Sequence, residues 1–214
     1  TFPVDSGTSS IDGEDITDLS EEKRARFLGR VFQDPMMGTA ADMWIEENMA
    51  LAARRGERRG LSWAISPADR ENFRRLLSEL DLGLEDRLSS KVGLLSGGQR
   101  QALTLLMAVM KKPKVLLLDE HTAALDPATA EKVLELTRSI VAEKKITCLM
   151  VTHNMHQALE LGNRTLMMDS GRIVFDVKGE ERSRMTVDGL LEKFRENAGK
   201  NLDNDRILLS KVEK

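Results

Sequence analysis

Residues 95–126 read LSGGQRQALTLLMAVMKKPKVLLLDEHTAALD, and this stretch decides the fold. A serine and two glycines precede a segment in which apolar residues recur at i, i+3, i+4 and i+7 from Ala102, which is typical of a helix that packs on a core. The four apolar residues Val115–Leu118 follow, and they are typical of a strand that is buried on both faces. The stretch therefore predicts a helix that leads into a parallel strand, as in α/β proteins.

The rest of the chain alternates apolar strands with helical segments, which predicts a parallel sheet covered on both faces. Asp12-Gly13 favours a hairpin near the start, since glycine adopts positive φ without steric cost. Residues 39–91 have a helical pattern. The other predicted strands are Arg30–Phe32, Ile146–Thr152 and Thr165–Met168, and the other predicted helices cover 18–29, 128–144, 155–161 and 186–198.

The composition is that of an ordinary globular protein, with 41% apolar and 31% charged residues in a chain of 214. A net charge of −3 provides no general attraction to nucleic acid or anionic lipid. Cys148 is the single cysteine, so no internal disulfide can form and a reducing compartment fits. No apolar run is long enough to cross a bilayer, so a membrane role would require partner subunits.

The turn before the striped helix is a candidate anion site. Ser96 is a good N-cap, and Gly97 and Gly98 allow backbone N–H groups to approach a ligand closely. The positive end of the helix dipole adds to this attraction. The alternative interpretation is an ordinary cap on a core helix.

Polar residues follow three predicted strands. Asp119 and Glu120 end the strand that begins at Val115, His153 ends a neighbouring strand, and Gln33 follows Phe32. Parallel strands bring their carboxyl ends to one edge of a sheet, where ligands of α/β proteins bind. An aspartate there can hold Mg²⁺, and a glutamate can activate water. Taken singly, each of these residues could equally be structural.

Five short segments resemble, in order and spacing, the Q-loop, signature, Walker B, D-loop and H-loop of ABC ATPases. In the same order, these segments are Gln33, residues 95–99, Asp119-Glu120, residues 124–126 and His153. The resemblance covers residues 1–180. It implies a P-loop NTPase (RecA-like) α/β fold in four parts: a remnant antiparallel β subdomain with the Q-loop at 1–38, a helical subdomain at 39–94, a RecA-like core at 95–180, and a C-terminal helix and tail at 181–214.

The resemblance also implies a role for each matching residue. Asp119 would support Mg²⁺, Glu120 would be the general base, His153 would contact the γ-phosphate, and Gln33 would sense Mg²⁺ and the attacking water. Across a dimer, the signature residues would bind ATP held by the opposite protomer, and Asp126 would lie at the seam. The signature residues are Ser96, Gly97, Gly98 and Gln99.

The implied function is the ATP-hydrolysing subunit of a transporter, favouring import. Its cofactors would be ATP and Mg²⁺. Its partners would be transmembrane permease subunits, a second ATPase subunit that is identical or different, and a separate solute-binding protein. The ATPase subunit itself would lie at the cytoplasmic face of the cell membrane. The run from Glu120 to Pro127 suggests an amino-acid-type cargo.

Two alternatives remain open. One is a soluble ABC-type ATPase acting on nucleic acid or ribosomes, although the segment between Gln33 and Ser96 is too short for the long coiled coil of such proteins. The other is an inactive partner in an asymmetric pair, against which Glu120 and His153 argue. We expect no nucleic acid as a partner.

The chain departs from the family pattern in two places. Position 121 is His121 where proline is usual, and we expect only a modest local effect. No G-x-x-x-x-G-K-[ST] phosphate loop occurs, and we expect that it lies upstream and is missing by truncation. We therefore expect the isolated chain to bind ATP weakly, and the strand Val115–Leu118 to have one unpaired edge.

Overall fold

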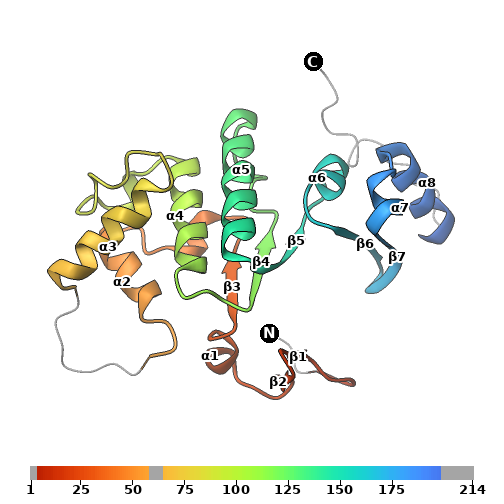
Figure 1. Cartoon of the computed structure of the whole chain (residues 1–214), viewed down its shortest axis with the longest axis horizontal. Helices are drawn as coiled ribbons and strands as arrows, with labels where there is room; N and C mark the ends of the chain where they lie inside the picture. Colours follow the sequence, from red (N-terminus) through yellow and green to blue (C-terminus); the bar gives the residue numbers. More distant parts are fainter. Residues whose placement is uncertain (1–3, 58–64, 199–214) are drawn as a thin grey trace. The chain divides into compact units, whose positions relative to one another are not determined.

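The computed structural model describes residues 4–57 and 65–198. The chain divides into two compact units, residues 1–151 and 152–214, and each is described by itself. Figure 1 shows the order of their elements along the chain. The tail beyond 198, including the end of the predicted 181–214 segment, lies outside the described residues.

The first unit contains a parallel sheet of three strands in the order β3-β4-β5. The strands are β3 (Leu28–Val31), β4 (Val115–Asp119) and β5 (Thr147–Val151). Val31 lies opposite Leu118, and Asp119 lies opposite Val151. The predicted parallel sheet is confirmed. The expected unpaired edge on β4 is wrong, because β4 is hydrogen-bonded to a strand on each side.

Two helices cover one face of this sheet. α4 (Gly97–Val109) and α5 (Pro127–Lys144) join Leu116 and Leu118 of β4 in one buried cluster. On the other face, Leu149 and Val151 of β5 are 52% and 54% exposed. Within the described residues of this unit, the expectation of a sheet covered on both faces is therefore wrong.

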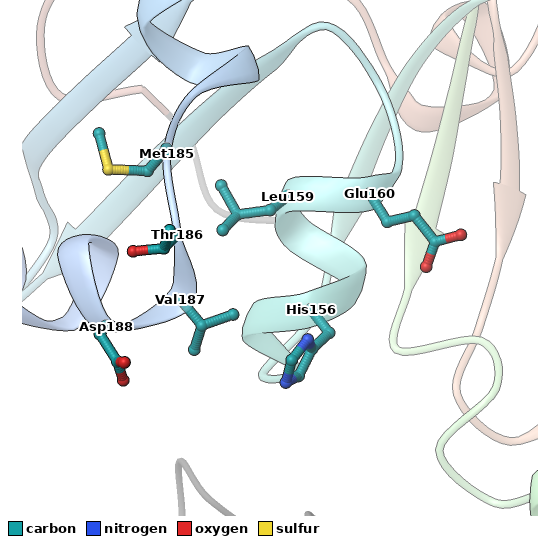
Figure 2. Close-up of a pocket in the computed structure, with 7 residues that line it drawn as sticks. All are labelled: His156, Leu159, Glu160, Met185, Thr186, Val187 and Asp188. Atoms are coloured by element: carbon teal, nitrogen blue, oxygen red, sulfur yellow. The ribbon is translucent and has the colours of Figure 1, made fainter.

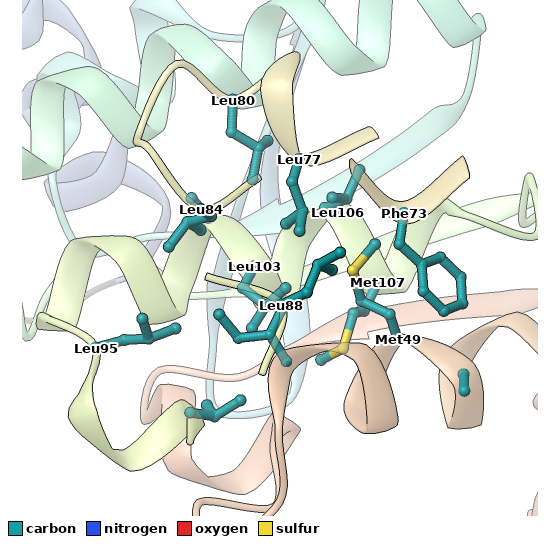
Figure 3. Close-up of a cluster of buried hydrophobic side chains, with 14 residues drawn as sticks. Met49, Phe73, Leu77, Leu80, Leu84, Leu88, Leu95, Leu103, Leu106 and Met107 are labelled. Atoms are coloured by element: carbon teal, nitrogen blue, oxygen red, sulfur yellow. The ribbon is translucent and has the colours of Figure 1, made fainter. Parts of the chain in front are cut away.

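A second apolar cluster holds the helical segment against α4. α2 (Ile45–Ala53) and α3 (Pro67–Ser78) contribute Met49, Phe73 and Leu77, which pack on Leu103 and Leu106 of α4 (Figure 3). Ser66 caps α3 through the amide of Asp69, and a proline occupies its first position. The same helix α4 thus contributes to both cores of the first unit.

At the beginning of the chain, the structure agrees with the sequence-based prediction only in part. β1 (Ser10–Ile11) and β2 (Glu14–Asp15) form the predicted hairpin, with Asp12 and Gly13 both at positive φ. The predicted helix over 18–29 is wrong, since α1 covers only Glu21–Arg24. The amides of Lys114 and Val115 bond to the carbonyl of Phe27, so pairing with β4 draws this part into the strand. Short 3-10 turns occupy η1 (Pro35–Gly38) and η2 (Val92–Leu94).

The second unit is a hairpin with three helices. Its strands β6 (Arg164–Asp169) and β7 (Arg172–Lys178) are antiparallel, and the turn places Ser170 and Gly171 at positive φ. The helices are α6 (Met155–Glu160), α7 (Gly179–Ser183) and α8 (Val187–Ala198). The sequence did not predict α7. Among the described helices of both units, none has the length and apolarity to cross a membrane.

Candidate functional site

The carboxyl edge of the parallel sheet brings the predicted residues of the first unit together. Asp119 is the last residue of β4, and Glu120 follows it directly. Gln33 comes two residues after the end of β3, the neighbouring strand, and its side chain is exposed. Because the strands are parallel, all three residues lie at one edge, as the sequence predicted.

Asp119 has a basic neighbour that sequence reasoning missed. Arg30 on β3 places its Nη2 atom 3.6 Å from Oδ2 of Asp119, and the same guanidinium lies 4.4 Å from the ring centroid of Phe32. Both charged side chains are about half exposed. An arginine on the strand paired with the acidic strand is the signal that could have identified it.

The donor set at this edge suits a cation that arrives with a nucleotide. Among the described residues, no group of three or more acidic, histidine or cysteine side chains could hold a metal. Magnesium sites in nucleotide-hydrolysing proteins use one or two carboxylates, with phosphate and water as the other ligands. A single half-exposed Asp119 at a strand end fits that arrangement.

The backbone at Glu120 is held in an unusual conformation. Its φ is +44°, in the left-handed region that non-glycine residues seldom adopt. Its amide donates to the carbonyl of Val151 at 3.0 Å, and its carbonyl accepts from the amide of Ala123 at 2.9 Å. At Glu120 the chain therefore leaves the sheet and enters a turn. Strained residues of this kind concentrate at functional sites.

The signature residues form a capped helix start. Ser96 Oγ accepts from the amide of Gln99 at 3.2 Å, and Gln99 Oε1 accepts from the amide of Ser96 at 3.2 Å. The amide of Arg100 bonds to the carbonyl of Ser96. The first-turn amides of Gly97 and Gly98 thus have no acceptor within the helix. The cap of the alternative interpretation is therefore present, and the anion site at the same helix start stays a prediction.

Gly98 is buried beneath the start of α5. A Cβ atom on Gly98 would lie 2.1 Å from Cγ2 of Thr129. Thr129 is itself fixed, because its amide donates to Oδ1 of Asp126, the N-cap of α5, at 3.1 Å. These hydrogen bonds from Thr129, side chain first and then backbone, lower the pKa of Asp126. Signature and D-loop residues therefore pack together within one chain, and the D-x-x-T pattern of a capped helix was the available signal.

Gln101 connects the signature helix to the residues before Gln33. Its side chain is fully buried, and Nε2 donates to the carbonyl of Phe32 at 3.2 Å. Its Oε1 atom is buried without a hydrogen-bond partner among the described residues. The sequence did not single out Gln101, because a polar residue on an apolar helix face has no distinctive pattern.

His121 is a buried histidine next to the two acids. Its ring is 2% exposed, and Nε2 lies 3.1 Å from Oγ1 of Thr137 on α5. Burial lowers the pKa of His121 to about 4, so the ring is neutral at pH 7. His121 is therefore a neutral group in the buried layer between the Glu120 turn and α5.

His153 belongs to the second unit. It is exposed, and the residues on either side of it form a compact helix start. Asn154 caps α6 by accepting from the amides of His156 and Gln157, and its own amide donates to Thr152 Oγ1 at 3.0 Å. His153 therefore lies in the hydrogen-bonded turn that begins α6.

The second unit also has a shallow pocket of about 610 Å³ between α6 and the start of α8 (Figure 2). None of the predicted site residues lines it. Its lining residues are His156, Leu159, Glu160, Met185, Thr186, Val187 and Asp188.

The sequence matches known proteins across most of its length. A sequence model of the ABC transporter family matches residues 1–123. The tyrosine transport ATP-binding protein of Clostridioides difficile (strain R20291) is 48% identical over 189 residues, which cover 88% of this chain and 75% of that protein. The lipoprotein-releasing system ATP-binding protein LolD 1 of Caulobacter vibrioides is 38% identical, with 80% and 71% covered.

A methionine import ATP-binding protein, MetN of Rhizobium johnstonii, is 36% identical, and the match covers 80% of this chain but 45% of that protein. The dimeric ATP-binding cassette MJ0796, solved with ADP and Pi in a post-hydrolysis state, has a TM-score of 0.66 at 27% identity over 81% of this chain and 74% of that chain. The cassette MJ1267 in its ADP conformation has a TM-score of 0.69 at 23% identity over 88% and 74%, which shows the shared fold.

The family match spans more than half of the chain, and two of the relatives are more than 30% identical and covered over more than two thirds of their length. The chain belongs to the ABC transporter family and is an ATP-binding, ATP-hydrolysing subunit within it.

Proposed function

We propose that Glu120 is the general base that activates water for attack on ATP, and that Asp119 holds Mg²⁺ at the same edge. The observation that carries this proposal is their position at the end of the central strand β4, at the same sheet edge as Gln33, which follows the neighbouring strand β3. The left-handed backbone at Glu120 supports it, because strained backbone of this kind is common at functional sites. Bound Mg²⁺ would offset negative charge on the phosphates.

Gln33 and His153 complete the proposed hydrolytic set. Gln33 is exposed at the sheet edge and would sense Mg²⁺ and the attacking water through its amide. His153 is exposed and lies two residues after the end of β5 in sequence, and it would contact the γ-phosphate. The division of the chain into four parts at 38, 94 and 180 remains part of this proposal.

We further propose that the signature serves a second protomer. Ser96 and the amides of Gly97 and Gly98 would bind the γ-phosphate of ATP held by an opposing ATPase subunit, with Gln99 supporting the turn. Ser96 is exposed at the helix start, which supports this role. Asp126 is exposed at the start of α5 and would lie at the seam. The solved cassette MJ0796 is a dimer, which also supports pairing.

The proposed setting is an importer at the cytoplasmic face of the cell membrane. Transmembrane permease subunits would dock beside Gln33, where Met36 and Met37 are 43% and 70% exposed. A separate solute-binding protein would deliver the cargo. We propose an amino acid as that cargo, since the tyrosine transport relative is 48% identical. No role with nucleic acid is proposed, since the net charge is −3 and the cited relatives are named for transport or release.

The test uses the complete ATPase protein assembled with its permease in liposomes, with the solute-binding protein supplied. Glu120→Gln should keep ATP binding, lower turnover by about a hundredfold or more, and accumulate ATP-bound dimers, because the carboxylate base is replaced by an isosteric amide. ATP hydrolysis and uptake of labelled tyrosine are measured on the same vesicles. Glu131→Gln, at an exposed position on α5, is the matched control and should be unchanged.

Unchanged turnover in the Glu120→Gln protein would remove Glu120 from its proposed role. Full hydrolysis without tyrosine uptake by the unsubstituted transporter would reject tyrosine as the cargo, while leaving the role of Glu120 intact.

A further inference from the structure

The turn that carries Glu120 is tied to α5 by the side chain of the next residue. His121 is 2% exposed, and Thr122 after it is 7% exposed. The ring of His121 reaches Thr137, which lies on the third turn of α5 and is itself 5% exposed. The contact is therefore shielded from water on both sides. Position 121 is also where the chain departs from the family pattern.

The hydrogen bonds around Thr137 assign the direction of this contact. Thr137 Oγ1 lies 2.7 Å from the carbonyl oxygen of Val133, which can only accept. A hydroxyl has one proton, so that proton is used for Val133. His121 Nε2, at 3.1 Å from the same oxygen, must then be the donor. His121 thus donates to Thr137, and Thr137 donates to the carbonyl of Val133. This relay of two hydrogen bonds connects His121 to the backbone of α5.

The backbone next to His121 needs such a restraint. Glu120 is held at φ +44°, which an L residue adopts only when its surroundings compensate for the cost. One restraint acts before the turn, where the amide of Glu120 bonds to Val151. The relay from His121 supplies a restraint immediately after it. Together they fix the direction in which the carboxylate of Glu120 projects.

We propose that His121 is a positioning residue for Glu120, which it holds in place through its hydrogen bond to Thr137. The inference rests on the proposed role of Glu120 as the base. His121 itself does not contact the nucleotide or the attacking water. Loss of the bond leaves the binding residues in place but lets the turn relax toward ordinary φ values, so the chemical step slows while ATP affinity stays the same.

Thr137 offers the cleanest substitution. Thr137→Val removes the hydroxyl and keeps the shape, whereas Thr137→Ser keeps the hydroxyl as the matched control. In the complete ATPase with its permease, Thr137→Val should lower kcat about tenfold with KM for ATP within about twofold, and Thr137→Ser should stay near the unsubstituted value. On the other side of the bond, His121→Phe should behave as Thr137→Val does, and His121→Gln, which retains an N–H donor, should recover most of kcat.

A role limited to stability would give a different pattern. It would lower the unfolding midpoint of the Thr137→Val protein without separating kcat from KM. Equal kcat values in the Thr137→Val and Thr137→Ser proteins would overturn the proposal. Adding Thr137→Val to Glu120→Gln should give no further loss of the residual turnover, because the group being positioned is already absent; a full additional tenfold loss would also overturn it.

Hydrogen exchange provides a readout that does not depend on turnover. The amide of Glu120 bonds to Val151 before the turn, and the amide of Ala123 bonds to Glu120 across it; both should exchange faster in the nucleotide-free Thr137→Val protein than in the Thr137→Ser protein. If Glu120→Gln retains turnover, the proposed base role fails. Faster exchange in the Thr137→Val protein would then still support the restraint of the turn by His121, and equal exchange in the two variants would refute that restraint.

Discussion

At the scale of single residues, the signature and D-loop residues stabilise the local structure by capping helices. Ser96 and Gln99 cap each other across the first turn of α4, and Asp126 caps α5 through Thr129. The geometry that caps the start of these helices also leaves backbone N–H groups directed outward. A capping interpretation and a ligand-binding interpretation are therefore compatible at this site, and the cap keeps the binding groups in place.

Gly98 allows a prediction at this scale. Gly98→Ala should destabilise the protein by about 1–3 kcal/mol, although alanine normally favours a helix, because the new Cβ would lie 2.1 Å from Cγ2 of Thr129. Thr129→Ser removes that methyl group, so the double substitution should recover most of the loss. Thermal unfolding midpoints of the unsubstituted protein, the two single variants and the double variant measure the coupling between positions 98 and 129. If Thr129→Ser gives no recovery, this contact does not explain the glycine.

At the scale of elements, polar side chains determine where α2 begins. Asn48 is 5% exposed, and its Oδ1 accepts from the amide of Ala40 at 2.8 Å. Its Nδ2 donates to the carbonyls of Ala40 at 3.1 Å and Trp44 at 2.9 Å. One side chain thus fixes the loop that leads from the Gln33 region into the helical segment. The helical pattern of residues 39–91 gave no sign of this, since hydrogen bonds to backbone atoms depend on the path of the chain.

Asparagine-to-alanine substitutions at two positions test this role. Asn48→Ala should lower the free energy of unfolding by about 1–3 kcal/mol, since the amide of Ala40 loses its acceptor and the carbonyls of Ala40 and Trp44 each lose one of two donors. Asn72→Ala on α3 is the control: Asn72 is exposed and bonds to the side chain of Arg75, so a change within about 0.5 kcal/mol is expected. Chemical denaturation measures both. Equal effects would contradict the role assigned to Asn48.

At the scale of the whole molecule, the uncovered face of the parallel sheet is the most conspicuous surface feature of the first unit. Leu149 and Val151 are more than half exposed on β5, while Leu116 and Leu118 on the other face of β4 are buried under α4 and α5. Exposed apolar groups on a sheet promote association between molecules.

We therefore expect the 214-residue chain to self-associate at micromolar concentration, and Leu149→Ser to weaken this by about tenfold. Leu94→Ser is the control, because Leu94 is 72% exposed but lies in η2, outside the sheet. Sedimentation velocity over a concentration series provides the measurement. A monomer at all concentrations, or an equal effect of both substitutions, would contradict the expectation.

The parallel α/β core, the start of α4, the extent of α5, and the placement of Gln33, Asp119 and Glu120 at one sheet edge could be predicted from the sequence. These follow from local signals: apolar runs, capping residues, and the rule that parallel strands end together. Caps and strand ends are encoded by neighbouring residues, so they can be read without a structure.

Only the tertiary structure decided the features that depend on distant pairs. The pairing of Arg30 with Asp119, the packing of Thr129 on Gly98 and the bond from His121 to Thr137 each join residues from different elements. The short α1 has the same origin, because hydrogen bonds at the start of β4 outweigh the helical pattern of residues 18–29. Long-range contacts of this kind leave no periodicity in the sequence, and they determine how the predicted residues are held.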